Sequence, residues 1–421
     1  MIRTYKNSIV LTGFFILTIF SGYAQQLRKI SEEEIKDKIH GYWIGQLAGN
    51  YVGFPFENLY ADEPIPILID RYYNFKDADT LDLMMNLDDR RAYTNIMADA
   101  MGGAWSDDDT DIEFVTLYAV EKYGLDLTYE EITDMWKKHI NRFIWSANRK
   151  ARDLMEEGYT PPATGNKVNN DYWYRITSQL VNEIWGAFYP GMIEKAATRS
   201  EWGAKIMCDD WATHATIVYG VMYSAAFFEK DIHQLLQIAM DQIPDDSPYK
   251  QGMKDVIQWH SEHEDWRTTR QLMHDKYYHE VNGFTIPYPV GGAVINGLSG
   301  IMALLYGEGD FTKTVAIATS AGYDCDNQAA TCGGLIGVMH GAQNIPDKFT
   351  LSMTSRGAWE KPFNNQYINY SRDGLPNYNE ISDIVDRILS ITAQAILYNG
   401  GKKVNEDGKW VYEVQTDFNH R

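Results

Sequence analysis

Apolar residues recur at helical spacing along much of the chain. Residues 32–48 place Ile35, Ile39 and Trp43 near one face, and residues 112–123 repeat this rhythm. Apolar positions three and four residues apart lie on the same side of an α-helix. Both segments are therefore predicted to form helices that turn one face toward a core.

Three further segments are apolar nearly all round. They are residues 211–228, 293–306 and 329–342, and the last two also carry many small residues. A helix without a polar face is a buried helix, and small residues let two such helices approach closely. These segments are predicted to lie at the centre of the fold.

Alternating patterns that are typical of strands are scarce. The clearest one covers residues 409–414 (KWVYEV), directly after a turn signal at 406–408 (EDG). Residues 58–92 and 159–172 follow neither pattern and are interpreted as irregular insertions. The sequence predicts a single all-α domain over residues 25–421, with a small strand-like extension at the C-terminal end.

The first residues follow a different pattern. A basic start precedes an apolar run from Ile9 to Phe20, and small residues at 21–24 end it. This order is typical of a cleavable secretory signal, and the run is short for a membrane span. We expect residues 1–24 to be removed, leaving a periplasmic or secreted protein without stable membrane insertion. An uncleaved membrane anchor is the alternative.

Charge and cysteine content narrow the function classes. The formal net charge is −20 at pH 7, which disfavours nucleic acid and anionic membranes as partners and favours cations. The three cysteines, Cys208, Cys325 and Cys332, are too few for a disulfide framework to hold a chain of this length.

One acidic cluster stands out at residues 106–111 (SDDDTD). Asp107, Asp108, Asp109 and Asp111 lie within five positions of each other. Like charges this close repel, so water and salt, a helix N-terminus or a bound cation must neutralise them.

A second cluster lies far along the chain, at residues 322–327 (GYDCDN), where Asp324 and Asp326 precede a helix rich in small residues. Mg²⁺ prefers several oxygen ligands, and two such clusters could meet around a pair of ions. The alternative is that both clusters only cap helices, with Thr110 and Glu113 forming a capping box. The residues alone favour a carboxylate-rich metal site in a helical protein.

Three elements, in this order, resemble those of the ADP-ribosylglycohydrolase family, in a bacterial, exported branch. They are residues 49–57 (GNYVGFPFE), residues 107–110 (DDDT) and residues 322–327 (GYDCDN). The resemblance covers about residues 36–345. It implies an all-α fold with a dinuclear, usually magnesium, centre, in which Mn²⁺ could replace Mg²⁺. The implied reaction is hydrolysis of an N- or O-glycosidic bond to ADP-ribose.

The resemblance also implies roles for particular residues. The metal ligands would be Asp107, Asp108, Asp109, Asp324, Asp326 and Asn327. The catalytic residues would be Glu57, Asp108 and Asp326. The substrate-binding residues would be His214, Gly322 and Tyr323.

The chain departs from the family pattern at three positions. Asn50 replaces a usual Asp, Asp107 replaces a Thr, and Asn327 replaces a Thr or Ser. If the family's Thr-Asp-Asp were aligned with Ser106, Asp107 and Asp108, Ser106 would restore the hydroxyl ligand. The alignment that matches Thr110 is preferred, because it keeps the apolar positions that follow in phase with those of the family. The departures leave the metal site in place and open the question of the substrate.

The leading hypothesis is an exported, metal-dependent hydrolase of a glycosidic bond to ADP-ribose or to a related ribosyl or sugar group, with a small-molecule or sugar-modified substrate as its partner. A second hypothesis is a hydrolase of another nucleoside, furanoside or N-linked glycoside. A third, from a different class, is a sugar- or nucleotide-binding protein of the same fold without turnover.

Overall fold

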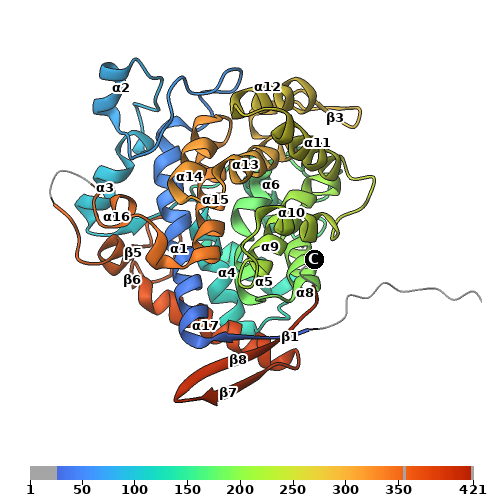
Figure 1. Ribbon diagram of the computed structural model, residues 1–421. Coiled ribbons are helices and arrows are strands. Elements are labelled where there is room, and N and C mark those ends of the chain that lie inside the picture. The colour runs from blue at the N-terminus through green and yellow to red at the C-terminus, as the bar shows by residue number, and fades with distance from the viewer. Residues whose placement is uncertain (1–25, 354–356, 419–421) are drawn as a thin grey trace, which may run out of the picture.

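The computed structural model describes residues 26–353 and 357–418, and it confirms the all-α class (Figure 1). The predicted secretory signal lies outside the described residues. The helices are α1 (Glu32–Gly53), α2 (Phe75–Leu81), α3 (Thr94–Met101), α4 (Thr110–Tyr123), α5 (Tyr129–His139), α6 (Ser146–Glu156), α7 (Ile184–Phe188), α8 (Ile193–Ala204), α9 (Thr213–Ala225), α10 (Ile232–Met240), α11 (Pro248–Glu262), α12 (Trp266–Tyr277), α13 (Ala293–Gly307), α14 (Phe311–Ser320), α15 (Cys325–His340), α16 (Asp347–Thr350) and α17 (Ile381–Tyr398). Within the described residues, no helix is long and apolar enough to cross a membrane.

The helices predicted from apolar spacing are present. The segments 32–48 and 112–123 lie in α1 and α4, and the three segments without a polar face correspond to α9, α13 and α15. Every residue of α13 is buried, as the pattern predicted. The α15 helix begins at residue 325, four residues earlier than expected, and so includes part of the second acidic cluster.

Helices α1 and α15 run side by side through the middle of the molecule (Figure 1). A Cβ on Gly41 would lie 2.2 Å from the carbonyl oxygen of Gly337, and one on Gly49 would lie 2.0 Å from that of Ala329. Since no side chain fits between them, glycine lets the two backbones touch. The same approach continues to Gly53, where a Cβ would lie 2.4 Å from the Cα of Asp326. The end of α1 is thereby fixed against the start of α15.

The strands form small sheets. They are β1 (Gln26–Ser31), β2 (Ala104–Trp105), β3 (Glu280–Val281), β4 (Phe284–Thr285), β5 (Gln366–Ile368), β6 (Tyr378–Glu380), β7 (Lys402–Glu406) and β8 (Lys409–Thr416). The predicted strand at 409–414 lies in β8, which pairs with both β7 and β1 in antiparallel order. Strand β1 was not predicted. This sheet lies at one end of the helical body, beside α1 and α17 (Figure 1).

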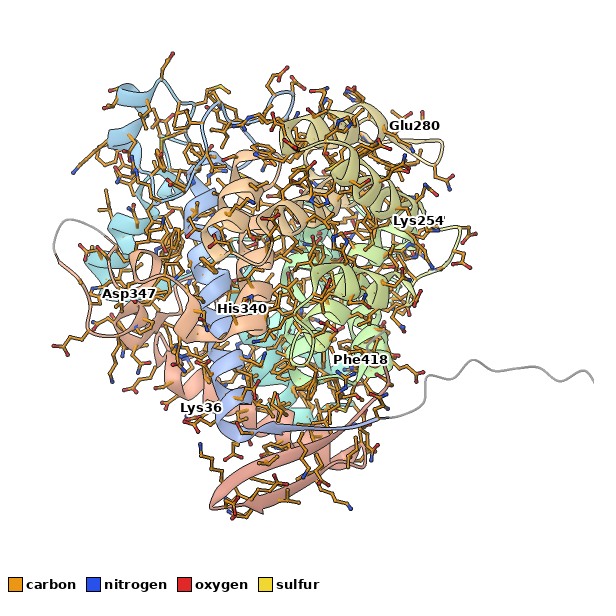
Figure 2. The ribbon with its side chains drawn as sticks, viewed as in Figure 1. Lys36, Lys254, Glu280, His340, Asp347 and Phe418 are labelled. Carbon is orange, nitrogen blue, oxygen red and sulfur yellow. The ribbon has the colours of Figure 1, made fainter. Side chains whose placement is uncertain are left out.

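The two predicted insertions differ. Residues 159–172 contain no helix or strand, as expected. Residues 58–92 were wrongly taken as irregular throughout, because Asn74 and Asp77 form a capping box that starts α2. Charged side chains such as Lys36, Lys254, Glu280 and Asp347 are exposed at the periphery (Figure 2), whereas the acidic clusters lie inside.

Candidate metal and active site

The two acidic clusters, which are far apart in sequence, line one cavity of about 650 Å³. Asp107, Asp108 and Asp109 precede α4, and Asp324 and Asp326 lie at the start of α15. A third segment adds Glu57, which follows the 3₁₀ turn Phe54–Phe56 at the end of α1. The structure therefore brings together five of the six predicted metal ligands and all three predicted catalytic residues.

Three of these carboxylates are close enough to share a cation. One oxygen each from Glu57, Asp324 and Asp326 lies within 4.8 Å of the other two. Buried oxygens nearby lack a donor, since neither Oδ1 of Asp326 nor Oδ1 of Asp107 has a hydrogen-bond partner among the described residues. A buried carboxylate oxygen without a donor is costly, and a hard divalent cation would satisfy it. The residues present therefore fit Mg²⁺ or Mn²⁺.

The alternative that the clusters only cap helices is wrong. Asp109 and Asp324 occupy the N-cap positions of α4 and α15, but neither side chain accepts a hydrogen bond from its helix. Glu113 does not close a capping box, because its carboxylate accepts hydrogen bonds from the Tyr42 hydroxyl and from the Ile184 N–H. These aspartates face the cavity rather than their own helix ends.

Asn50 links the two clusters across the α1–α15 contact. Its side-chain amide donates to Oδ2 of Asp109 and lies 3.4 Å from Oδ2 of Asp326. An aspartate here would add a further negative charge between two carboxylates, whereas the neutral amide offers them donors. The departure from the family pattern at this position is thus consistent with an intact acidic site.

Arginines neutralise part of the cluster. Arg90 forms an ion pair with Asp107, and Arg91 lies 2.9 Å from Glu57 and also pairs with Asp89. The extra charge that Asp107 brings therefore has its own counter-ion. Asp111, the remaining acid of the first cluster, points elsewhere and pairs with Arg372 at 2.9 Å.

Burial dominates the acid–base behaviour of the site. It raises the pKa of Glu57 to about 7, with Asp324 adding to the shift and Arg91 opposing it. Burial also raises the pKa of Asp108, Asp109 and Asp326 well above the usual range of a carboxyl group, and neighbouring carboxylates add to each shift. A divalent cation would offset this charge, so metal and protons compete for the same oxygens.

Two predicted substrate-binding residues, Gly322 and Tyr323, shape the loop before Asp324 without lining the cavity. Both have positive φ, and a Cβ on Gly322 would lie 1.9 Å from the carbonyl oxygen of Tyr60, so only glycine fits there. The Tyr323 ring is buried and stacks on His274. These residues position Asp324, and their contact with substrate stays a prediction.

His214 and Asn327 also lie outside the lining of the cavity. His214 lies on α9, and its Nδ1 atom is 2.7 Å from the Ser247 hydroxyl. Asn327 is buried on α15, and its Oδ1 accepts a hydrogen bond from the Gln328 amide at 2.7 Å. Asn327 is the one predicted metal ligand that is not at the cavity.

Other lining residues were not among the predicted site residues. They are arginines and aromatic residues, among them Arg90, Arg91, Trp145, Tyr172, Tyr174, Arg175 and Tyr288. Several lie in or beside the two segments interpreted as insertions, where the sequence carries no periodic signal. The adjacent arginines at 90 and 91 were the only local hint.

Comparisons with known proteins bear on the family and on the fold. The family model described as ADP-ribosylglycohydrolase matches residues 31–375. No curated protein matches the chain. Among solved structures, one titled "ADP-ribosylglycohydrolase-related protein complex" is 16% identical, with a TM-score of 0.53, over 86% of this chain and 99% of that one. At this identity the likeness shows the fold alone. On the extent of the family-model match, the chain belongs to the ADP-ribosylglycohydrolase family.

Proposed function

We propose that the protein is a magnesium-dependent hydrolase of a glycosidic bond to ADP-ribose or to a related ribosyl or sugar group. Family membership supports a glycohydrolase. The observation that carries the metal dependence is the approach of Glu57, Asp324 and Asp326 to within 4.8 Å, beside carboxylate oxygens that have no donor.

The carboxylates that line the cavity would hold the ions. Five of them are the proposed ligands of two ions, Asp107, Asp108, Asp109, Asp324 and Asp326, and one oxygen of Glu57 is close enough to Asp324 and Asp326 to join them. When bound, Mg²⁺ or Mn²⁺ would supply Lewis-acid polarisation of the sugar hydroxyls and of a water molecule. Asn327 would need to turn toward the cavity to join them.

Glu57 is the proposed acid–base group. Without metal, burial and the neighbouring Asp324 raise the pKa of its carboxyl to about 7, and a cation nearby would lower this pKa, which favours the ionised form that accepts a proton. Arg91 holds one of its oxygens at 2.9 Å and so fixes its direction. Asp108 and Asp326 would stabilise the positive charge that develops on the sugar ring.

The proposed location is the periplasm or the outside of the cell, on the basis of the N-terminal pattern. The substrate is then a sugar-modified or small molecule that is present in that space. N-terminal sequencing of the exported protein should begin at Gln25, and full-length chain recovered from the cytoplasm would contradict export.

Turnover of a substrate panel tests the proposal. ADP-ribosylated peptides, nucleosides, furanosides and N-linked glycosides would be incubated with the mature protein, with and without Mg²⁺. Sugar release that requires the metal and is lost in Asp324→Ala supports the proposal. If a chelator leaves the rate unchanged, the metal dependence fails. If no glycoside of the panel turns over, the hydrolase proposal fails and the binding-protein hypothesis remains.

A further inference from the structure

Arg175 is a buried cation on the wall of the same cavity. It precedes the 3₁₀ turn Ile176–Val181, and only 8% of its surface is exposed. Its guanidinium lies against Gly291, where a Cβ would be 2.2 Å from Nη2, and 4.6 Å from the centre of the Tyr288 ring. Packing of this kind fixes the direction of the side chain.

The other two arginines of the cavity are already paired. Arg90 binds Asp107, and Arg91 binds Glu57 and Asp89. By contrast, within residues 26–353 and 357–418 the Arg175 side chain has no ion pair, and its buried Nε has no hydrogen-bond acceptor. A desolvated guanidinium without an acceptor is costly, so a missing partner is expected.

That partner is expected to be an anion. The Arg175 charge acts on Asp324 and opposes the burial that raises the pKa of this carboxyl, yet the two groups form no ion pair. A divalent cation on Asp324 would leave two positive centres facing one cavity. An oxyanion between them would satisfy both, and guanidinium binds carboxylate and phosphate oxygens in a bidentate geometry.

We propose that Arg175 anchors an oxyanion of the substrate, a phosphate or a carboxylate group, and so selects anionic glycosides. This inference rests on the proposed function, since the metal-binding carboxylates form the other wall of the cavity. Tyr288 covers the guanidinium and is half exposed, so it lies between the anchored group and solvent.

The test measures binding of small oxyanions by calorimetry and thermal melting. Inorganic phosphate and acetate would be titrated into the mature protein with Mg²⁺, against sodium chloride at equal ionic strength. The variants are Arg175→Gln and Arg175→Lys. The matched control is Arg267→Gln, which changes a partly exposed arginine on α12 that does not line the cavity.

Saturable binding of phosphate or acetate that weakens by about tenfold to a hundredfold in Arg175→Gln supports the proposal. Whether phosphate or acetate binds more tightly tells whether the anchored group of the substrate is a phosphate or a carboxylate. Arg175→Lys should lose part of the affinity, because lysine keeps the charge but lacks the planar guanidinium that binds two oxygens at once. Arg267→Gln should lose none. If Arg175→Gln does not fold, Arg175→Lys carries the test.

If Arg175 had only a structural role, its substitution would change the melting temperature and not the binding of oxyanions. Without ligand, Arg175→Gln should melt at or above the wild-type temperature, since it removes an unpartnered buried charge. A lower melting temperature with unchanged phosphate and acetate binding would overturn the proposal, as would no oxyanion binding by the wild type. Arg175-dependent binding without any effect of Mg²⁺ or turnover would instead leave this site standing and remove the proposed function.

Discussion

Two groups of buried acids lie within the same helical body, and they are neutralised differently. Glu113 and Glu183 form an enclosed pair: Glu113 accepts from Tyr42 and from the Ile184 N–H, and the Thr331 hydroxyl donates to Glu183 at 2.6 Å. Burial raises the pKa of both carboxyls, to about 7 for Glu113. A single shared proton would satisfy this pair, because the Oε2 of Glu183 otherwise has no partner within residues 26–353 and 357–418.

The cavity group is larger and cannot be neutralised in this way. Seven carboxylates line it, whereas Arg90 and Arg91 pair with only three of them, Asp107, Glu57 and Asp89. Its unpartnered oxygens lie beside an accessible cavity rather than in a closed core. The comparison teaches that burial alone does not mark a functional acid. A functional acid is marked instead by an open cavity together with carboxylate charge that no counter-ion balances.

The largest expected effect separates Glu57 from Glu113. Glu57→Gln is nearly isosteric and removes the ability to exchange a proton, so turnover should fall by about 10²–10⁴. The fold and the response to Mg²⁺ should persist, because the amide keeps an oxygen ligand. Sugar release from the best substrate of the panel measures the rate.

Glu113→Gln is the matched control, since it makes the same change in the enclosed pair. It should retain turnover near the wild-type rate. If the two variants are equally active, Glu57 has no acid–base role, and the proton must be handled by the aspartates around the metal.

Metal binding should distinguish the cavity carboxylates from the enclosed pair of Glu113 and Glu183. A ligand that binds only the folded state stabilises it by about 2.7 kcal/mol at a hundredfold excess over its Kd. Mg²⁺ or Mn²⁺ should therefore raise the melting temperature of the wild type and of Glu183→Gln. Asp324→Ala should abolish the increment, and a melting curve that ignores millimolar metal in the wild type would remove the metal site.

The pH dependence of stability gives a third contrast. The folded-state pKa of Glu57 is about 7, above its ordinary value of 4.5, so without metal the folded protein binds more protons than the unfolded chain between these values. Stability should then be highest at the acidic end of this range and fall as pH rises through it. Mg²⁺ replaces the protons, so its stabilising increment should grow with pH.

Thermal melts across this range, with and without Mg²⁺, measure the effect. The enclosed pair predicts the same fall with rising pH, because burial raises both of its pKa values, but no recovery by metal. A Glu57→Gln variant therefore should lose part of the pH dependence and Glu113→Gln another part. An increment from Mg²⁺ that shrinks with rising pH would contradict competition between metal and protons.

The central helices and the acidic clusters were predictable from sequence because each is encoded locally. Apolar spacing gave α1, α4 and α13, and the clusters at 107–109 and 324–326 each stand in one short stretch. Strand β1 was missed because its pairing partner, β8, is some 380 residues away, and six residues of mixed polarity do not reveal it.

The counter-ions of the site were unpredictable for the same reason. That Arg90 pairs with Asp107, while Arg175 has no ion pair in the part of the chain that the structure describes, depends on how the loops fold over the cavity, not on a local pattern. The enclosed pair was equally hidden. Glu113 and Glu183 are distant in sequence, and Glu113 fitted a capping box that the structure does not form. Spacing predicts faces of helices, whereas ion pairs are set by tertiary contacts.

The smallest expected effect concerns stability without metal. Asp326→Asn removes one charge from a group whose members repel, and its Oδ1 has no donor to lose. The free energy of unfolding should rise by about 0.5–2 kcal/mol, as is common when a functional site is neutralised. Glu113→Gln should change it in the other direction by about 1 kcal/mol, because its carboxylate accepts two hydrogen bonds that an amide satisfies less well. Urea unfolding in a chelator measures both. Destabilisation by Asp326→Asn would mean that this carboxylate, like Glu113, holds the fold together and that the cavity group owes its burial to structure rather than to a bound cation.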